Sequence, residues 1–294
     1  MASWPDISAQ ISATVNTTFQ GKEIVTIGGG CINQTFKISD GDIHYFAKLN
    51  SAGSLPMFEA EAAGLNEIYQ TQTLRVPQPI CWGENNHQSW LILEYLHLSN
   101  TSKGNAAALG SGLAAMHQIH SKHFGWTRNN TIGKTAQINT TTTDWVQFWR
   151  KNRLGYQLNL AKNNGYSGKL QQLGERLMSD LSVFFNSTSP AASLLHGDLW
   201  NGNVSFDTNG QPIIYDPAVY YGDREADIAM TELFGLLPIA FYSAYQDDYP
   251  LDSGYNTRKT LYNLYHVLNH LNLFGGSYRH QAEQMMNQLL VEIR

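Results

Sequence analysis

The segment LLHGDLWNGN, residues 194–203, gathers a His, an Asp, a Trp and two Asn side chains. Asp198 is placed to accept a proton from a substrate hydroxyl, as a carboxylate general base does. Asn203 opens a short strand-like segment, and Asp216 ends the next one, PIIYD. A hairpin of these segments would bring Asn203 and Asp216 close together, and their side-chain oxygens suit Mg²⁺. Each carboxylate alone is better explained by a turn or a helix cap, but the ordered set favours a catalytic loop.

A second candidate is Lys48, which lies among apolar residues in the strand-like segment IHYFAKL. An ammonium there is costly unless a carboxylate pairs with it. Glu61, in the next helix-like segment, could be that partner and leave Lys48 to hold phosphate oxygens. Glu59 competes for the role, but Glu61 is preferred because EAAGL continues into the apolar face. Taken alone, the two residues are better explained as a solvent-facing lysine and an ordinary helical glutamate.

A third candidate is the glycine-rich loop GGGCINQ between two strand-like segments. Glycine lets backbone N–H groups approach a phosphate and adopts positive φ without steric cost, although a tight hairpin also uses glycine. The loop is neither a Walker A sequence nor a dinucleotide fingerprint, because no GK[ST] follows and the next element is a strand. Its residues are Gly28, Gly29, Gly30, Cys31, Ile32, Asn33 and Gln34. Cys31 is either a redox-sensitive thiol or an inert one.

Composition limits the class of protein. The chain has 294 residues, of which 42% are hydrophobic, and a formal net charge of −5, which describes a globular protein. Lys and Arg form no run, so no nucleic-acid partner is expected. No apolar stretch reaches the about 18 to 20 residues of a membrane span, so no membrane partner is expected either. Cys31 and Cys81 are the only cysteines, and the N-terminal residues do not resemble a signal peptide. The sequence therefore predicts a cytoplasmic protein.

The period of the apolar residues changes near residue 97. Before it, strands are predicted at 23–27, 35–39, 43–49, 79–84 and 89–96, with helices at 6–19 and 57–70. After it, helices are predicted at 105–120, 143–161, 167–185, 223–235, 257–274 and 280–293, with strands at 203–206 and 212–216. This change predicts two domains, residues 1–97 and 98–294.

HGDLWNGN, followed thirteen residues later by Asp216, resembles the catalytic and metal-binding loops of the small-molecule branch of the protein-kinase-like fold. With GGGCINQTF and YDPAVYYGDREADIAMTELFG, it is similar to the fructosamine kinase family over nearly the whole chain. The resemblance implies a two-lobed α+β fold. A small antiparallel-sheet lobe with one main helix would bind nucleotide, and a mostly helical lobe would carry the catalytic and metal-binding loops.

The resemblance also implies that ATP and Mg²⁺ are used. Residues 28–34 would cover the ATP phosphates, and Lys48, held by Glu61, would contact them. The segment LILEYL resembles the hinge, in which backbone atoms around Glu94 and Leu96 read the adenine edge.

The same resemblance assigns the catalytic roles. Asp198 would be the catalytic base, and Asn203 and Asp216 would hold magnesium, so that positioning and charge neutralisation supply most of the catalysis. Asp227 and His196 resemble residues that organise the catalytic loop rather than react. Because DPA replaces DFG and no APE-like motif follows, activation by phosphorylation is not expected.

The activity implied is phosphorylation of a sugar hydroxyl of a ketosamine, free or on a protein. Asp223, Arg224 and Glu225 are candidates for contacts with the substrate's hydroxyls or amine. Four aromatic residues could stack on a sugar or belong to the core: Trp145, Phe148, Trp149 and Tyr156. The alternatives are an aminoglycoside, choline or free-sugar kinase of the same fold, or an inactive nucleotide-binding scaffold. The Trp after HGDL argues against the first two kinases, and the intact set of candidate residues argues against the scaffold.

Overall fold

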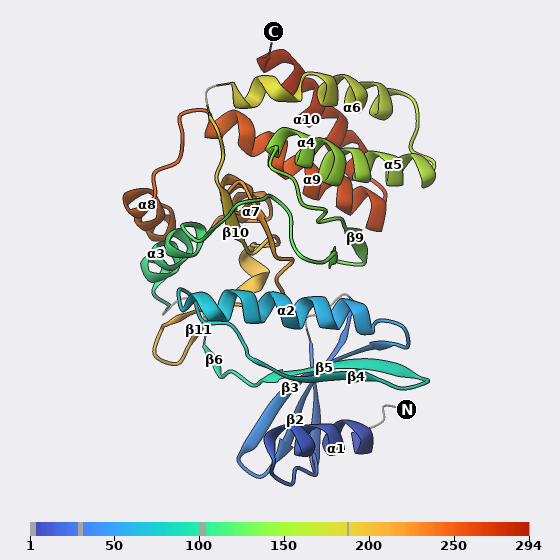
Figure 1. Ribbon diagram of the computed structural model, residues 1–294, viewed down its shortest axis with the longest axis vertical. Helices are drawn as coiled ribbons and strands as arrows, with labels where there is room; N and C mark the ends of the chain where they lie inside the picture. The colour runs from blue at the N-terminus through green and yellow to red at the C-terminus, as the bar shows by residue number, and fades with distance from the viewer. Residues whose placement is uncertain (1–3, 29–31, 100–103, 187, 294) are drawn as a thin grey trace. The chain divides into compact units, whose positions relative to one another are not determined.

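A computed structural model describes residues 4–28, 32–99, 104–186 and 188–293. The chain divides into two compact units, the first made of Met1–Asn105 and Ser205–Pro217 and the second of Ala106–Val204 and Ala218–Arg294. A five-stranded antiparallel sheet belongs to the first unit, and most helices belong to the second (Figure 1), so the chain has the predicted α+β composition. Across the described ranges, no helix combines the length and apolar character that a bilayer span requires.

The sheet of the first unit has the strand order β1-β2-β3-β5-β4. Its strands are β1 (Glu23–Ile27), β2 (Gln34–Asp40), β3 (Ile43–Ser51), β4 (Pro79–Glu84) and β5 (Gln88–Glu94). These bounds agree with the predicted strands to within two residues at each end. Among its described residues, this unit has the α-helices α1 (Trp4–Val15) and α2 (Leu55–Thr71).

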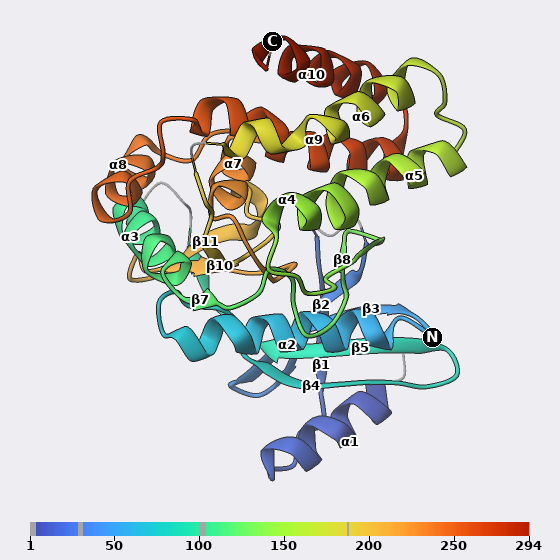
Figure 2. The same ribbon diagram turned by 45° about the horizontal axis from the view of Figure 1, so that its top comes forward.

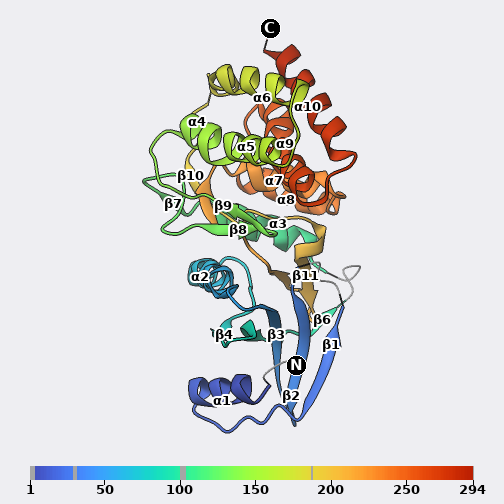
Figure 3. The same cartoon turned by 90° about the vertical axis from the view of Figure 1, so that its right-hand side faces the viewer.

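The alternation of side chains along β3 decides which face of the sheet carries chemistry. Ala47 and Leu49 point to one face, where they pack with Ile7 and Ile11 of α1. Lys48 lies between them in sequence and therefore points to the other face, which α2 covers (Figures 1 and 3). The sheet thus separates an apolar layer under α1 from a charged position under α2.

A small second sheet leads the chain to Asp216. It consists of β6 (Leu98–Ser99), β11 (Val204–Asp207) and β12 (Pro212–Ile214), in the order β12-β11-β6. The N–H of Ile214 donates to the carbonyl of Arg75 at 3.0 Å, which ties β12 to the segment after α2. Asp216 follows two residues after β12 and belongs to the first unit.

The second unit is built from helices and a three-stranded sheet. Helices α3 (Ala106–His117) and α8 (Ile239–Asp248) lie side by side (Figure 2). The remaining α-helices are α4 (Trp145–Phe148), α5 (Tyr156–Asn163), α6 (Lys169–Ser179), α7 (Glu225–Leu233), α9 (Tyr255–Phe274) and α10 (Tyr278–Glu292). The sheet has the order β13-β10-β7, with β7 (His120–Ser121), β10 (Ala192–Leu195) and β13 (Tyr220–Gly222). A separate hairpin pairs β8 (Asn130–Ile132) with β9 (Thr135–Gln137).

The prediction of one continuous α-helix over 143–161 is wrong, because a π-helix interrupts it. The structure has α4, then a π-helix over Trp149–Gly155, and then α5. The π-helix contains Arg153, which is fully buried and packs on the ring of Tyr220, a contact between distant residues that helical spacing in the sequence does not reveal. Helix α8 was not predicted from the sequence.

Candidate active site

Lys48 is a buried cation held by two carboxylates of its own unit. Its side chain is 4% exposed, and its Nζ lies 2.6 Å from Oε1 of Glu61 and also contacts Oδ1 of Asp216. Burial alone would lower the pKa of Lys48, but Asp216 and Glu61 outweigh burial and raise the pKa above its ordinary value. The ammonium is therefore charged at neutral pH. Glu61, and not Glu59, is the helical carboxylate that pairs with Lys48.

Asp216 adopts a backbone conformation that only a few residue types tolerate. Its φ is +58°, in the left-handed region, where Asp and Asn are the commonest residues other than glycine. Its side chain is 48% exposed, although Oδ1 contacts the buried Lys48. The carboxylate is thus anchored at one oxygen and accessible elsewhere, as a group that must also bind a ligand has to be.

The described part of the glycine-rich loop is anchored by Asn50. Its Nδ2 donates to Oδ1 of Asn33 at 2.7 Å and to the carbonyl of Ile32 at 3.4 Å. Asn50 lies two residues after Lys48 on β3 and so points to the same face of the sheet. This alternation is a signal from which the sequence could have identified Asn50.

Two further candidates of the glycine-rich loop lie at its borders with the strands β1 and β2. Gln34 begins β2, and Gly28 lies just after β1, where an added Cβ would meet nothing within 4 Å. Gly29, Gly30 and Cys31 lie outside the described residues. The proposed phosphate contacts of the loop therefore remain predictions.

The hinge candidates follow directly from β5. Glu94 is the last residue of the strand, and its N–H donates to the carbonyl of Gln78 at 2.8 Å. Its carboxylate accepts from Nη2 of Arg75 at 2.8 Å. The adenine contacts around Glu94 therefore remain a prediction. Leu96 is half-buried two residues further on.

The catalytic-loop candidates begin where β10 ends. His196 is buried, and its N–H donates to Oδ2 of Asp227 at 2.7 Å. The N–H of Gly197 donates to Oδ1 of the same carboxylate at 2.9 Å. Although burial of Asp227 favours its neutral form, its hydrogen bonds and the neighbouring histidines hold its pKa below the ordinary value. A buried, ionised Asp227 therefore fixes the backbone at the start of the loop.

His117 of α3 completes the support of Asp227. Its Nε2 lies 3.2 Å from Oδ2 of Asp227, and its Nδ1 lies 2.8 Å from the hydroxyl of Tyr245 in α8. Burial lowers the pKa of His117, which favours the neutral ring. Because an ionised carboxylate can only accept, Nε2 must carry the proton and Nδ1 must accept from Tyr245. His117 was not identified from the sequence, because a lone His in an Ala-rich helix carries no distinctive pattern.

Asn203 orients Asp198. Its Nδ2 donates to the backbone carbonyl of Asp198 at 2.8 Å and to Oδ2 of its carboxylate at 3.3 Å. These contacts use the amide nitrogen and leave Oδ1, the atom of an amide that can bind a cation, outside this pair. In the chain, Asn203 immediately precedes β11 and Asp216 follows β12, so the two residues flank one hairpin. Their joint binding of a metal remains a prediction.

Asp223, Arg224 and Glu225, the candidates for contacts with the substrate, all have partners inside the second unit. Glu225 is 2% exposed and forms a two-pronged ion pair with Arg258 of α9, at 2.7 and 2.8 Å. Asp223 is also buried and accepts from the Tyr262 hydroxyl; burial and then the nearby Glu225 raise its pKa to about 7. Both carboxylates are therefore occupied inside the second unit.

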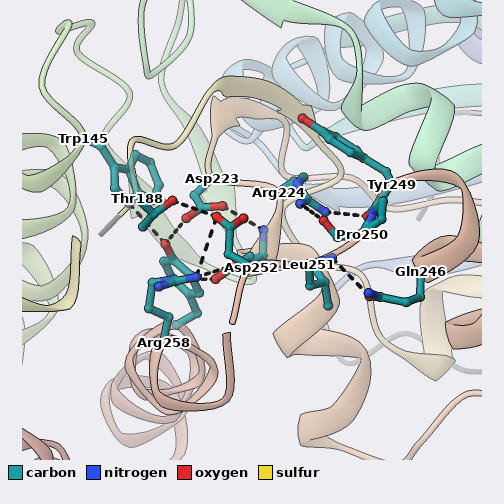
Figure 4. Close-up of polar contacts among 12 residues, drawn as sticks. Trp145, Thr188, Asp223, Arg224, Gln246, Tyr249, Pro250, Leu251, Asp252 and Arg258 are labelled. Carbon is teal, nitrogen blue, oxygen red and sulfur yellow. Dashed lines mark hydrogen bonds and ion pairs between the residues drawn. The ribbon is translucent and has the colours of Figure 1, made fainter. Parts of the chain in front are cut away.

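Arg224 is likewise engaged within its unit. Its guanidinium lies over the ring of Tyr249, 3.8 Å from the centroid, and donates to the carbonyls of Tyr249 and Pro250 (Figure 4). It thus ties the start of α7 to the connection between α8 and α9. Residue type and spacing alone do not distinguish such internal contacts from substrate contacts.

The aromatic candidates in the region 143–161 belong mainly to the core. Trp145, Phe148 and Trp149 are each at most 4% exposed and contact one another's rings. Tyr156 is half-buried. Trp200 differs, because it is 37% exposed two residues after Asp198 and meets Phe234 edge-on at 6.3 Å.

Comparison with known proteins identifies the family. The model of the fructosamine kinase family matches residues 3–292. The chain belongs to the fructosamine kinase family. It is 46% identical to a Synechocystis protein named "probable ketoamine kinase", over 98% of this chain and 97% of the relative. It is 42% identical to the chloroplastic protein-ribulosamine 3-kinase of Arabidopsis thaliana, over 91% of this chain and 82% of the relative.

Solved structures agree with this membership. A Haemophilus somnus crystal structure named for fructosamine-3-kinase has a TM-score of 0.90 and 30% identity, and the match covers 98% of this chain and 97% of that one. An aminoglycoside phosphotransferase, crystallised with ADP and hygromycin B, has a TM-score of 0.64 at 12% identity over 97% of this chain and 98% of that one. At that identity the likeness shows the fold alone. The predicted protein-kinase-like fold is confirmed.

The burial of Glu225 generates a test of its role. The substitution Glu225→Gln replaces the carboxylate that pairs with Arg258 by a neutral amide. Because this leaves the buried guanidinium of Arg258 without that partner, we expect the free energy of unfolding to fall by about 3 kcal/mol. Urea unfolding measures the change. The matched control is Glu283→Gln, which breaks an ion pair with the half-exposed Arg279 and should cost less than about 1 kcal/mol.

Substrate kinetics complete this test. The KM for substrate of folded Glu225→Gln should equal that of the parent protein. A several-fold rise in that KM without loss of stability would contradict the structural role and indicate that Glu225 contacts the substrate.

Proposed function

We propose that this protein transfers the γ-phosphate of ATP to a hydroxyl of a ketosamine, a sugar joined to an amine through a ketose carbon. The membership in the fructosamine kinase family carries the proposal, because a relative named for ketoamine kinase is 46% identical over 98% of the chain. The relative named for ribulosamine phosphorylation supports the same acceptor class. The substrate is a ketosamine either free or attached to a protein amine.

The candidate residues divide the chemistry between them. Asp198 accepts the proton of the attacking hydroxyl, and Asn203 holds its carboxylate in a fixed orientation. Lys48 holds phosphate oxygens with its charged ammonium, which Glu61 keeps in place. The glycine-rich loop and the hinge around Glu94 and Leu96 position the nucleotide. Phosphoryl transfer needs little more than such positioning and charge stabilisation.

The donor set fits a hard divalent cation. Asp216 offers an exposed carboxylate and Asn203 an amide oxygen, which are ligands that Mg²⁺ accepts alongside phosphate oxygens and water. These two residues would hold Mg²⁺, whose bound charge neutralises the phosphate oxygens. Among the described residues, no group of three His, Cys, Asp or Glu side chains forms a metal site independent of a nucleotide.

Trp200 is the residue we assign to the sugar. Its indole is 37% exposed next to the proposed base, and an aromatic face packs against the C–H groups of a sugar ring. We assign this contact to Trp200 rather than to residues 223–225, because the side chains of those residues pair with other groups inside the second unit. We also propose a cytoplasmic location, which the sparse cysteines and the buried, free Cys81 support.

A panel of acceptors tests the proposed function. ATP turnover is measured with fructosyl-, ribulosyl- and erythrulosyl-lysine, the matching free sugars, kanamycin and choline. We expect the ketosamines to lead by at least about tenfold in kcat/KM, which needs only about 1.4 kcal/mol of differential transition-state binding. Preference for kanamycin, choline or a free sugar would contradict the ketosamine assignment and leave the kinase reaction intact. Binding of ATP with no acceptor phosphorylated would favour the inactive scaffold.

The role of Trp200 is tested by substitution. Trp200→Leu should raise the KM for a ketosamine about tenfold and leave the KM for ATP within about twofold, because a stacking face is lost from the acceptor alone. Trp82→Leu is the matched control, since Trp82 is also 37% exposed but lies on β4 of the first unit. Steady-state kinetics of both variants measure the difference. Equal effects of the two substitutions on the ketosamine KM would remove Trp200 from the site.

A further inference from the structure

Two side-chain amides of the β8–β9 hairpin, in the second unit, donate hydrogen bonds to backbone carbonyls just after Asp216 and Pro217. Nε2 of Gln137 donates to the carbonyl of Ala218 at 2.9 Å. Nδ2 of Asn130 donates to the carbonyl of Val219 at 2.8 Å. Gln137 is 1% exposed and Asn130 is 8% exposed, so water does not compete for these hydrogen bonds.

Ala218 also meets the catalytic loop within the same unit. Its N–H donates to the carbonyl of His196 at 2.8 Å. A Cβ added to Gly197 would lie only 2.1 Å from the carbonyl oxygen of Ala218, so glycine is needed there both for this approach and for its φ of +81°. Ala218 is therefore held from one side by Gln137 and from the other by the loop that carries Asp198.

The orientation of Gln137 is determined by its partners. Backbone carbonyls can only accept, so Nδ2 of Asn130 must face Val219, and Oδ1 of Asn130 then accepts from Nε2 of Gln137 at 2.9 Å. Oε1 of Gln137 accepts from the hydroxyl of Tyr265 at 2.9 Å. Burial raises the pKa of Tyr265 to about 12, so the hydroxyl keeps the proton that it donates. A flipped Gln137 amide would oppose oxygen to oxygen at Ala218 and Asn130.

The network is anchored at its other end by Arg153. This fully buried guanidinium donates to the carbonyl of Ile138 at 2.6 Å and to Oδ1 of Asn139 at 2.8 Å. It also lies 4.1 Å from the ring centroid of Tyr220, the first residue of β13. Within the described ranges, no carboxylate forms an ion pair with Arg153, so the carbonyl, the amide and the aromatic rings hold its charge. A cation in this setting leaves the hairpin little freedom to move.

We propose that Gln137 is a positioning residue for phosphoryl transfer: by holding Ala218 against the catalytic loop, it restricts where the metal-binding carboxylate of Asp216 can lie. Asp216 precedes Ala218 by two residues, so covalent geometry alone keeps their Cα atoms within about 7.6 Å. The inference rests on the proposed function, because the roles of Asp198 and Asp216 are assigned there. Gln137 touches no reacting atom in this proposal.

The test compares Gln137→Met with the parent protein in two measurements. Loss of the amide should raise the Mg²⁺ concentration for half-maximal turnover about tenfold and lower kcat by a similar factor, with the ketosamine KM changed less than about twofold. Calorimetry should give the same rise in the Mg²⁺ needed for half-saturating ATP binding. That readout applies even if no ketosamine is phosphorylated, so failure of the proposed function is distinguishable from failure of this inference.

Two further variants separate positioning from stability. Tyr265→Phe removes only the hydroxyl that orients Gln137, so it should shift the Mg²⁺ requirement in the same direction by a smaller factor even if Gln137→Met does not fold. Gln171→Met is the matched control, because Gln171 is a half-buried glutamine of the same unit whose amide also donates to backbone carbonyls, those of Leu158 and Tyr166. It should leave the Mg²⁺ requirement unchanged. A parental Mg²⁺ requirement in both network variants, or an equal shift in Gln171→Met, would overturn the proposal.

Discussion

A lysine ammonium buried in protein stays charged only where neighbouring groups offset the cost of its burial, and the first unit meets that requirement with two carboxylates. Lys48 is 4% exposed, so Glu61 from α2 and Asp216 from the segment after β12 both come to it. The sheet makes this possible by alternation, since the neighbours of Lys48 on β3 bury their side chains under α1 on the opposite face. Two of these three charges, Lys48 and Asp216, are also those proposed to bind phosphate and magnesium, and Glu61 holds Lys48 in place.

The second unit contains the opposite case, a buried carboxylate that needs hydrogen-bond donors. Asp227 receives the N–H groups of His196 and Gly197 and the ring of His117, so its charge is stabilised by donors that also fix the start of the catalytic loop. Tyr245 links this arrangement to α8. Neither Asp227 nor His117 needs to meet a substrate for its loss to disturb Asp198.

Local pattern predicted the elements whose residues interact with near neighbours in the chain. The strands β1 to β5 and the helix α2 follow from alternation, turn glycines and helical spacing, and the pairing of Lys48 with Glu61 follows from the cost of a buried ammonium. The π-helix over Trp149–Gly155 does not, because it depends on packing of Arg153 against rings far away in sequence.

The candidate site divides in the same way. Asp198, Asn203 and Asp216 stand out by type and spacing, and the resemblance assigns their roles. Glu225 has an equally suggestive sequence context, yet its partner Arg258 lies 33 positions further along the chain and takes it out of solvent. Gln137 gives no sequence signal, since its role depends on a carbonyl 81 positions away. Only the three-dimensional structure separates a charged residue that serves a ligand from one that serves the fold.

Calorimetric titration of ATP with and without Mg²⁺ on two variants tests the division of labour between the carboxylates most directly. Asp198→Asn should retain Mg-ATP affinity within about twofold while turnover falls by about 10²-fold or more, because a base acts only on the acceptor hydroxyl. Asp216→Ala should weaken Mg²⁺-dependent ATP binding at least about tenfold, because a ligand of the metal is lost while Lys48 keeps Glu61. Equal and mild losses of affinity and turnover in both variants would contradict the assignment of Asp198 as base and Asp216 as metal ligand.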